Sequence, residues 1–175
     1  MDHSLRRLVD RQAIHDVLLR YCRGIDRLDL DLVRQCYHPG ARDHHGAFVG
    51  PVEDFLPWVA EQVTRFESTT HFLGNVLVEF DDDNSTVAWS EAYCVAFHRL
   101  AGDDQRPPRD SIAGFRYVDR FERRDPAAPP GEGWRIADRR VVVDWNRLDE
   151  IDAPGFSPSY LLGRRGGDDP VVDRW

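Results

Sequence analysis

The chain has 175 residues, of which 41% are hydrophobic and 31% are charged, values typical of a single globular domain with its own core. Its net charge of −8 argues against non-specific binding to nucleic acid, and no apolar run is long enough to cross a membrane. The N-terminal residues lack the apolar core of a secretion signal, so a cytoplasmic location is expected.

The residue types that are missing or isolated also exclude several kinds of chemistry. The chain contains no lysine, which excludes Schiff-base catalysis, pyridoxal-phosphate attachment and a Walker-type phosphate loop. The cysteines lack C-x-x-C spacing, so we expect small core residues rather than disulfides or a zinc site: Cys22, Cys36 and Cys94. Four arginine pairs lie among acidic residues and are interpreted as solvated surface: Arg6-Arg7, Arg123-Arg124, Arg139-Arg140 and Arg164-Arg165.

The first half of the chain is predicted to be helical. Apolar residues recur at three- and four-residue spacing from Leu5 to Tyr21 and predict an amphipathic helix, which Gly24 weakens near its end. Asp29 is a candidate N-cap for a second helix, and Pro51 is suited to open a third. These two helices are expected at Leu30–Tyr37, stopped by Pro39-Gly40, and at Val52–Phe66, with a short strand at Ala41–His45 between them.

The second half is predicted to consist of long strands rich in β-branched and aromatic residues. They are expected at Thr70–Phe80, Thr86–Leu100, Ser111–Arg123 and Trp134–Leu148, with a hairpin turn at Asp81–Asn84 and loops at Gly102–Arg109 and Asp125–Gly133. Helices followed by strands predict one α+β domain over residues 1–150, with a strongly curved mixed or antiparallel sheet that encloses a pocket. The tail at residues 151–175 has little periodicity and is either a flexible end or a flap over that pocket.

His71 and Asp26 are the residues on which chemistry is predicted. His71 lies in a strand among small and polar neighbours, and Asp26 lies near the end of the first helix. A buried carboxylate that holds an imidazole in one tautomer makes a general base that works near neutral pH. With Tyr21 as a hydroxyl donor, Asp26 and His71 are the predicted catalytic residues. The structural alternatives are a strand histidine with no catalytic role and an exposed acid at a helix end.

Four further residues are predicted to bind a substrate. His98 ends a strand above a row of small side chains, and Tyr117 lies on a central strand. Only one of the adjacent His44 and His45 can face inward, and His45 is expected to line the pocket. Asn75 belongs to the polar segment that follows His71. The histidines lack metal-binding spacing, so neither a metal nor another cofactor is predicted.

The order of these segments resembles the SnoaL-like branch of the nuclear-transport-factor-like superfamily, which includes scytalone dehydratase and a bile-acid dehydratase. The matching segments are Arg20-Tyr21 with Gly24-Ile25-Asp26, Asp43-His44-His45-Gly46 with Gly50-Pro51, Thr70–Asn75, Arg116–Glu122 and Trp134-Arg135-Ile136. The resemblance implies a cone-shaped α+β domain with an Asp–His dyad at Asp26 and His71. It also implies roles for Tyr21 and His98 beside the dyad, and assembly as a homodimer or homotrimer.

Together, these residues predict a cofactor-independent lyase or isomerase. His71 would remove a proton from a small hydrophobic cyclic substrate, as a dehydratase does, with Asp26 holding the imidazole. The first alternative is a non-catalytic ligand-binding or assembly subunit of the same fold. The second is a polyketide cyclase that uses the same aspartate as an acid.

Overall fold

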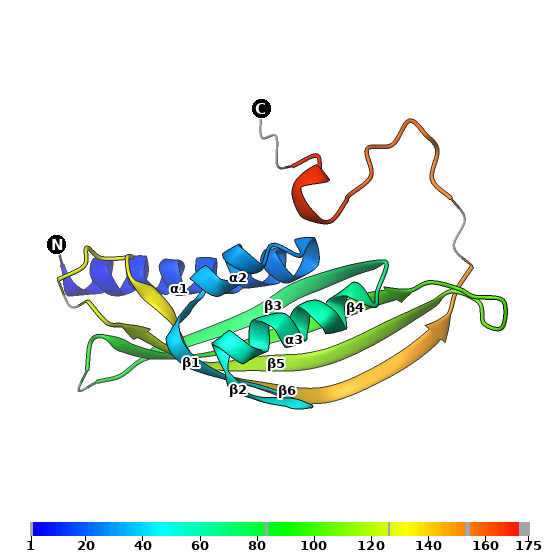
Figure 1. The fold of residues 1–175 in the computed structure, drawn as a ribbon. Coiled ribbons are helices and arrows are strands. Elements are labelled where there is room, and N and C mark those ends of the chain that lie inside the picture. Colours follow the sequence, from blue (N-terminus) through cyan, green and yellow to red (C-terminus); the bar gives the residue numbers. More distant parts are fainter. Residues whose placement is uncertain (1, 83, 126, 153–154, 172–175) are drawn as a thin grey trace.

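The computed structural model describes residues 2–82, 84–125, 127–152 and 155–171, and packs helices against one face of a curved sheet (Figure 1). The α-helices are α1 (His3–Arg27), α2 (Leu30–Gln35) and α3 (Val52–Thr64), and a short 3-10 turn spans Gly166–Asp168. The strands are β1 (Tyr37–His45), β2 (Phe48–Pro51), β3 (Ser68–Phe80), β4 (Val87–Leu100), β5 (Arg109–Arg123) and β6 (Trp134–Glu150).

The six strands form one sheet in the order β2-β1-β6-β5-β4-β3. The pairing of β1 with β6 is parallel and the other pairings are antiparallel, so the sheet is mixed. In Figure 1 the helices lie together above the sheet, and α1 runs along the edge formed by β3. The predicted α+β fold with a curved mixed sheet is therefore confirmed.

The helical half follows the predicted order, and α3 ends at Thr64, two residues before the predicted end. α1 continues past Gly24, where a Cβ atom would lie 2.6 Å from Cγ2 of Val33, so this glycine allows α2 to approach closely. Asp29 caps α2 as predicted, because its Oδ1 accepts the backbone N–H of Leu32 at 2.9 Å. Tyr37 begins β1 instead of ending α2, because it pairs with Ile136 of β6.

The four long predicted strands are confirmed to within two residues at their ends, β1 begins four residues before the predicted start at Ala41, and the sheet gains a strand that was not predicted. β2 is only four residues long and pairs with β1 after a turn at Gly46, whose φ is 68°. Pro39-Gly40 lies within β1, where the pairing with β6 shifts register, rather than acting as a helix stop. The expected hairpin and loop segments include Asp83 and Pro126, which lie outside the described residues.

The core between helices and sheet contains a buried ion pair. Arg139 and Asp119 are fully buried, and the guanidinium donates from Nε to Oδ1 at 2.8 Å and from Nη2 to Oδ2 at 2.6 Å. Arg123 is also buried, at 3% exposure. The interpretation of the arginine pairs as solvated surface is therefore wrong for these two residues, because the pleat of a strand turns one member of each adjacent pair inward. Among the described helices, none combines the length and apolar character that crossing a membrane requires.

Candidate active site

The last turn of α1 and the start of β3 bring Asp26 and His71 together. His71 Nδ1 lies 2.7 Å from Asp26 Oδ1, and the backbone N–H of His71 donates to Oδ2 at 2.9 Å. Thr69, on the same face of β3, donates its hydroxyl to Oδ1 at 2.9 Å. An ionised carboxylate only accepts hydrogen bonds, so Nδ1 carries the ring proton and Nε2 keeps its lone pair. The carboxylate thus holds the imidazole in the tautomer that a general base requires.

The dyad is shielded from bulk solvent but lines a cavity. The His71 side chain is 8% exposed and that of Asp26 is 15% exposed. They border a cavity of about 390 Å³ whose other walls are Leu19, Cys22, Arg23, Arg27, Phe72 and Leu73. A neighbouring hollow of about 430 Å³ shares Arg23 and Arg27 with this cavity and extends below the tail at Gly166 and Gly167. A small molecule thus has a route to the dyad between α1, β3 and the tail.

His98 lies beside His71 on the neighbouring strand β4. The two rings are perpendicular with centroids 5.6 Å apart, and the ring of Phe66 covers His98 at 4.8 Å. Burial lowers the pKa of His98 to about 4, and the nearby His71 adds to this effect. The neutral ring of His98 donates from Nδ1 to the carbonyl of Ser111 at 3.3 Å, which leaves Nε2 as an acceptor. His98 can therefore accept a hydrogen bond from a substrate hydroxyl but cannot donate one to a carbonyl.

Tyr21 and Tyr117 are buried deeper in the core than the walls of the dyad cavity. Both rings face the guanidinium of Arg139, whose Cζ lies 4.0 Å from each centroid. The ring of Phe115 lies 5.1 Å from that of Tyr117 and 6.4 Å from that of His71. Burial raises the pKa of both tyrosine hydroxyls, so both stay protonated. Neither tyrosine lines the dyad cavity in which we expected them.

The remaining predicted residues lie elsewhere in the sheet. His45 faces inward and His44 outward, as the pleat requires, and His45 Nδ1 lies 3.2 Å from Asp43 Oδ1 in a second histidine–carboxylate pair. The ring of His45 packs against Phe55 of α3 at 5.3 Å rather than against the dyad. Asn75 is exposed in the bulge of β3. In the described part of the chain, no three histidine, cysteine or acidic side chains are placed to hold a metal ion.

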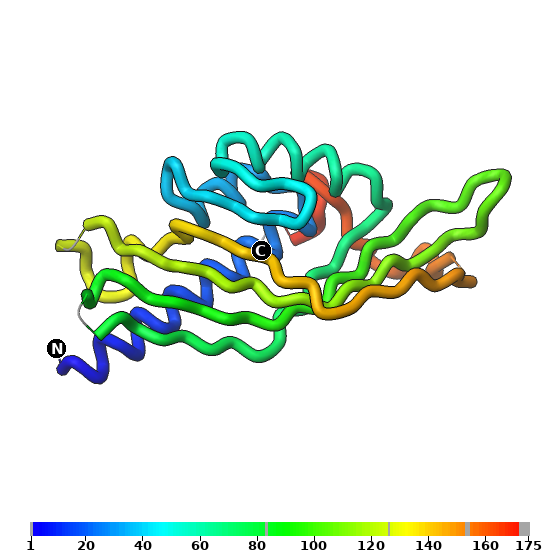
Figure 2. The backbone as a smooth tube through the Cα atoms, turned by 90° about the horizontal axis from the view of Figure 1, so that it is seen from below, coloured from blue at the N-terminus to red at the C-terminus, as the bar shows by residue number. Residues whose placement is uncertain are grey.

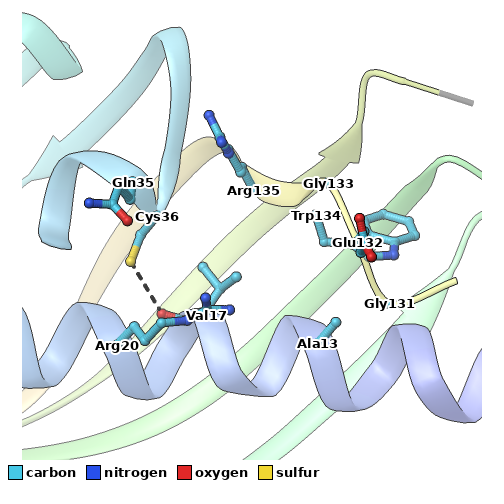
Figure 3. A pocket seen from close by; sticks show the side chains of 10 residues that line it. All are labelled: Ala13, Val17, Arg20, Gln35, Cys36, Gly131, Glu132, Gly133, Trp134 and Arg135. Atoms are coloured by element: carbon cyan, nitrogen blue, oxygen red, sulfur yellow. Dashed lines mark hydrogen bonds between the residues drawn. The ribbon is translucent and has the colours of Figure 1, made fainter. Parts of the chain in front are cut away.

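A separate pocket of about 310 Å³ lies between α1 and the segment that leads into β6 (Figure 3). Its walls include Val17, Cys36, Trp134 and Arg135. Cys36 donates its thiol to the carbonyl of Val17, and burial raises the pKa of this thiol to about 11. The thiol stays protonated, and the carboxylate of Glu132 in the walls is exposed and is not paired with any histidine of the described residues. The dyad cavity is the better candidate for an active site.

The described part of the tail packs against the helices near the dyad, while its role as a flap over the pocket stays a prediction. Figures 1 and 2 show its red segment beside the ends of α1 and α3. Asp169 forms an ion pair with Arg27 of α1 at 3.2 Å and accepts the backbone N–H of Arg164 at 2.9 Å. Arg165 donates to the carbonyls of Val63 and Phe66, at the end of α3, at 3.0 and 2.7 Å. The surface interpretation is thus also wrong for Arg165, which sequence patterns did not identify because the tail has no periodicity.

Comparison with known proteins agrees with this architecture. The SnoaL-like domain model matches residues 6–140, so the chain belongs to the SnoaL-like family. A search of curated protein sequences found no match.

Solved structures of the same fold cover most of the chain. A hexachlorocyclohexane dehydrochlorinase is 17% identical, with a TM-score of 0.70 over 89% of this chain and 98% of that one. A proposed scytalone dehydratase from Novosphingobium aromaticivorans is 18% identical, with a TM-score of 0.68 over 89% and 97%. A protein from Kribbella flavida is 19% identical, with a TM-score of 0.64 over 79% and 93%. At these identities the likeness establishes the fold.

Proposed function

We propose that this protein is a cofactor-independent lyase or isomerase that removes a proton from carbon in a small hydrophobic cyclic molecule. The observation that carries the proposal is the hydrogen bond of 2.7 Å between His71 Nδ1 and Asp26 Oδ1 at the wall of a cavity. Membership of the SnoaL-like family supports it. Two structural relatives are named for eliminations, one of water and one of hydrogen chloride.

The proposed chemistry needs only side chains of this site. Nε2 of His71 takes a proton from a carbon that is acidified by a carbonyl or that lies beside a leaving group. In an elimination, the electron pair of the broken C–H bond forms a double bond as the leaving group departs. The imidazolium gives its proton to a departing hydroxyl, which leaves as water, or to solvent when chloride leaves. In an isomerisation, the pair moves into the carbonyl, and the imidazolium returns the proton at another carbon. Asp26 stabilises the imidazolium, and general base catalysis of this kind contributes about 10²–10⁴-fold.

The polar neighbours of the dyad support binding of an oxygenated ring. His98 does not line the dyad cavity, but its ring contacts that of His71, so its Nε2 could accept a hydrogen bond from the hydroxyl of a substrate that reaches past His71. The apolar walls at Leu19, Phe72 and Leu73 suit a hydrocarbon skeleton. We assign no direct role to Tyr21, because its ring contacts Arg139 in the core.

The test is an exchange assay that works on a whole class of candidate substrates at once. A library of cyclic ketones and hydroxyketones is incubated with protein in D₂O, and exchange of α protons is followed by proton NMR. We expect exchange with the wild type and its loss in His71→Gln. The matched control is His45→Gln, which removes the histidine of the second pair without touching the dyad cavity. Exchange that persists in His71→Gln would overturn the dyad mechanism, and ligand binding without exchange would favour the non-catalytic binding alternative.

A further inference from the structure

Two arginines line the dyad cavity and a third is held at the end of α3, although the chain as a whole is acidic. Arg23 and Arg27 of α1 line the cavity, and Arg165 of the tail bonds to the carbonyls of Val63 and Phe66. The net charge of the chain is −8, so a cluster of cations beside the candidate base is a local exception. Such a cluster either pairs with carboxylates of the protein or is available for a ligand.

The carboxylates near these arginines leave two of them without an ionic partner. Asp169 pairs with Arg27, and both oxygens of Asp26 are occupied by hydrogen bonds from β3. Within the described chain, Arg23 forms no hydrogen bond or ion pair, and Arg165 bonds only to backbone carbonyls. Nε and Nη2 of Arg165 are buried without a hydrogen-bond partner among the described residues. Buried charged donors without partners are costly, and a ligand anion would remove that cost.

A series of contacts leads from Arg165 to the dyad. Its Nη1 is held by the carbonyl of Phe66, whose ring packs on His98, and the ring of His98 meets that of His71. Desolvation lowers the pKa of Arg165, while the charge of Asp26 opposes this shift. The guanidinium is therefore partly removed from water and lies within electrostatic range of the catalytic carboxylate.

The unpartnered edge of Arg165 has the shape that binds a carboxylate. Nε and Nη2 form one edge of the guanidinium, and two parallel N–H bonds from this edge match the two oxygens of a carboxylate. Three other arginines of this protein hold a carboxylate through this same pair of nitrogens. They are Arg139 with Asp119, Arg99 with Asp110, and Arg116 with Asp144. In Arg165 the third nitrogen, Nη1, donates to the carbonyls of Val63 and Phe66. These two hydrogen bonds restrict rotation of the guanidinium and so hold the edge formed by Nε and Nη2 in one orientation.

We propose that the ligand of the dyad cavity carries a carboxylate, which Arg165 binds through Nε and Nη2 with additional attraction from Arg23. This inference deepens the proposed function, because it narrows the substrate to a carboxylated ring. Ligand binding does not require the dyad to be catalytic, so the two proposals can fail separately.

The test compares two probes that differ only in charge, 2-naphthoate and 2-naphthamide, by isothermal titration calorimetry. We expect wild-type protein to prefer the carboxylate. Arg165→Gln should weaken naphthoate binding about tenfold to a hundredfold, the range for a lost charge-assisted hydrogen bond, with little change for naphthamide. Arg23→Gln should weaken naphthoate binding by a smaller factor. The matched control is Arg164→Gln, since the Arg164 side chain is exposed and only its backbone N–H is bonded.

A second variant separates carboxylate binding from closure of the tail. Arg165→Lys keeps the charge and can still donate to the α3 carbonyls, but it lacks the two-nitrogen edge. Hydrogen exchange of residues 163–171 should match the wild type, while the preference for naphthoate falls. His71→Gln should retain this preference even if it abolishes proton exchange. The proposal is overturned if wild-type protein does not bind naphthoate at millimolar concentration, shows no preference for it, or keeps its preference in both Arg165 variants.

Discussion

Asparagine in place of Asp26 keeps the shape of the side chain but can accept hydrogen bonds on only one of its two terminal atoms. In the structure, Oδ2 accepts the backbone N–H of His71, whereas Oδ1 accepts His71 Nδ1 and the hydroxyl of Thr69. A backbone N–H can only donate, but an imidazole nitrogen and a hydroxyl oxygen can also accept. The amide of Asp26→Asn should therefore turn its oxygen to the backbone and its NH₂ group to the ring.

This orientation changes which ring nitrogen carries the proton. Nδ1 of His71 becomes an acceptor, the proton moves to Nε2, and the nitrogen that served as the base loses its lone pair. We expect kcat/KM to fall by about 10²–10⁴-fold, the range for loss of general base catalysis. The cost in folding stability should be only about 1–2 kcal/mol, because the site exchanges charge-assisted hydrogen bonds for neutral ones.

The tautomer can be read without a substrate from long-range proton–nitrogen correlations of ¹⁵N-labelled histidine. We expect a proton on Nδ1 of His71 in the wild type and on Nε2 in Asp26→Asn. Asp29→Asn is the control, since asparagine caps helices as well as aspartate does and Asp29 does not touch the ring. The same Nδ1–H tautomer in Asp26→Asn would refute the reasoning. Destabilisation above about 4 kcal/mol would instead indicate a structural role for Asp26.

Three further predictions concern stability. His98 has a folded pKa of about 4 against an ordinary 6.5, so the unfolded chain binds the proton first as the pH falls. The neutral ring of His98 stabilises the folded state fully above pH 6.5. This stabilisation is lost as the pH falls from 6.5 to 4, and the loss in unfolding free energy is at most about 3 kcal/mol, and smaller because the ring is not completely buried. Urea unfolding at both pH values should show a smaller loss in His98→Gln than in wild type. Arg139→Met leaves Asp119 buried without a counter-ion and should cost about 3–5 kcal/mol, most of it recovered in Arg139→Met/Asp119→Leu. A double variant no more stable than the single one would contradict that account. Replacing glycine by alanine usually stabilises a helix. In Gly24→Ala the new methyl group would clash with Val33, so we expect a loss of about 1–2 kcal/mol in folding stability, measured by thermal unfolding. A raised Tm would contradict this expectation.

The fold could be predicted from the sequence where periodicity and turn chemistry agree. β5 could be predicted from its β-branched and aromatic residues, and its burial alternates regularly from Phe115 to Arg123. The cap at Asp29 followed from a side chain that bonds its own helix. By contrast, Phe48–Pro51 is a strand only because β1 lies beside it, and Tyr37 leaves its helix because Ile136 pairs with it. Such boundaries depend on partners that are distant in sequence.

The two residues of the dyad could be selected from their sequence contexts, but only the family resemblance implied that they meet. Asp26 and His71 are forty-five residues apart, and their meeting depends on how far α1 slides along β3. The helical period identifies the buried face of α1, and the strand period identifies the inner face of β3, but neither defines this register. His71 and His45 both have a carboxylate partner, but only His71 lines the cavity. This difference depends on where each residue lies in the sheet, which local sequence does not show.

The arginine pairs show most clearly what local sequence leaves out. Two adjacent arginines look alike in composition, yet a strand buries Arg123 and Arg139, and the anchored tail half-buries Arg165, while the neighbour of each is exposed. Burying an arginine costs less free energy where a carboxylate pairs with its charge, and Asp119 on the neighbouring strand pairs with Arg139. In Arg165 the same edge is buried and has no such carboxylate in the described chain. The reasoning that explains Arg139 as part of the fold therefore leads, for Arg165, to a carboxylate supplied by the ligand.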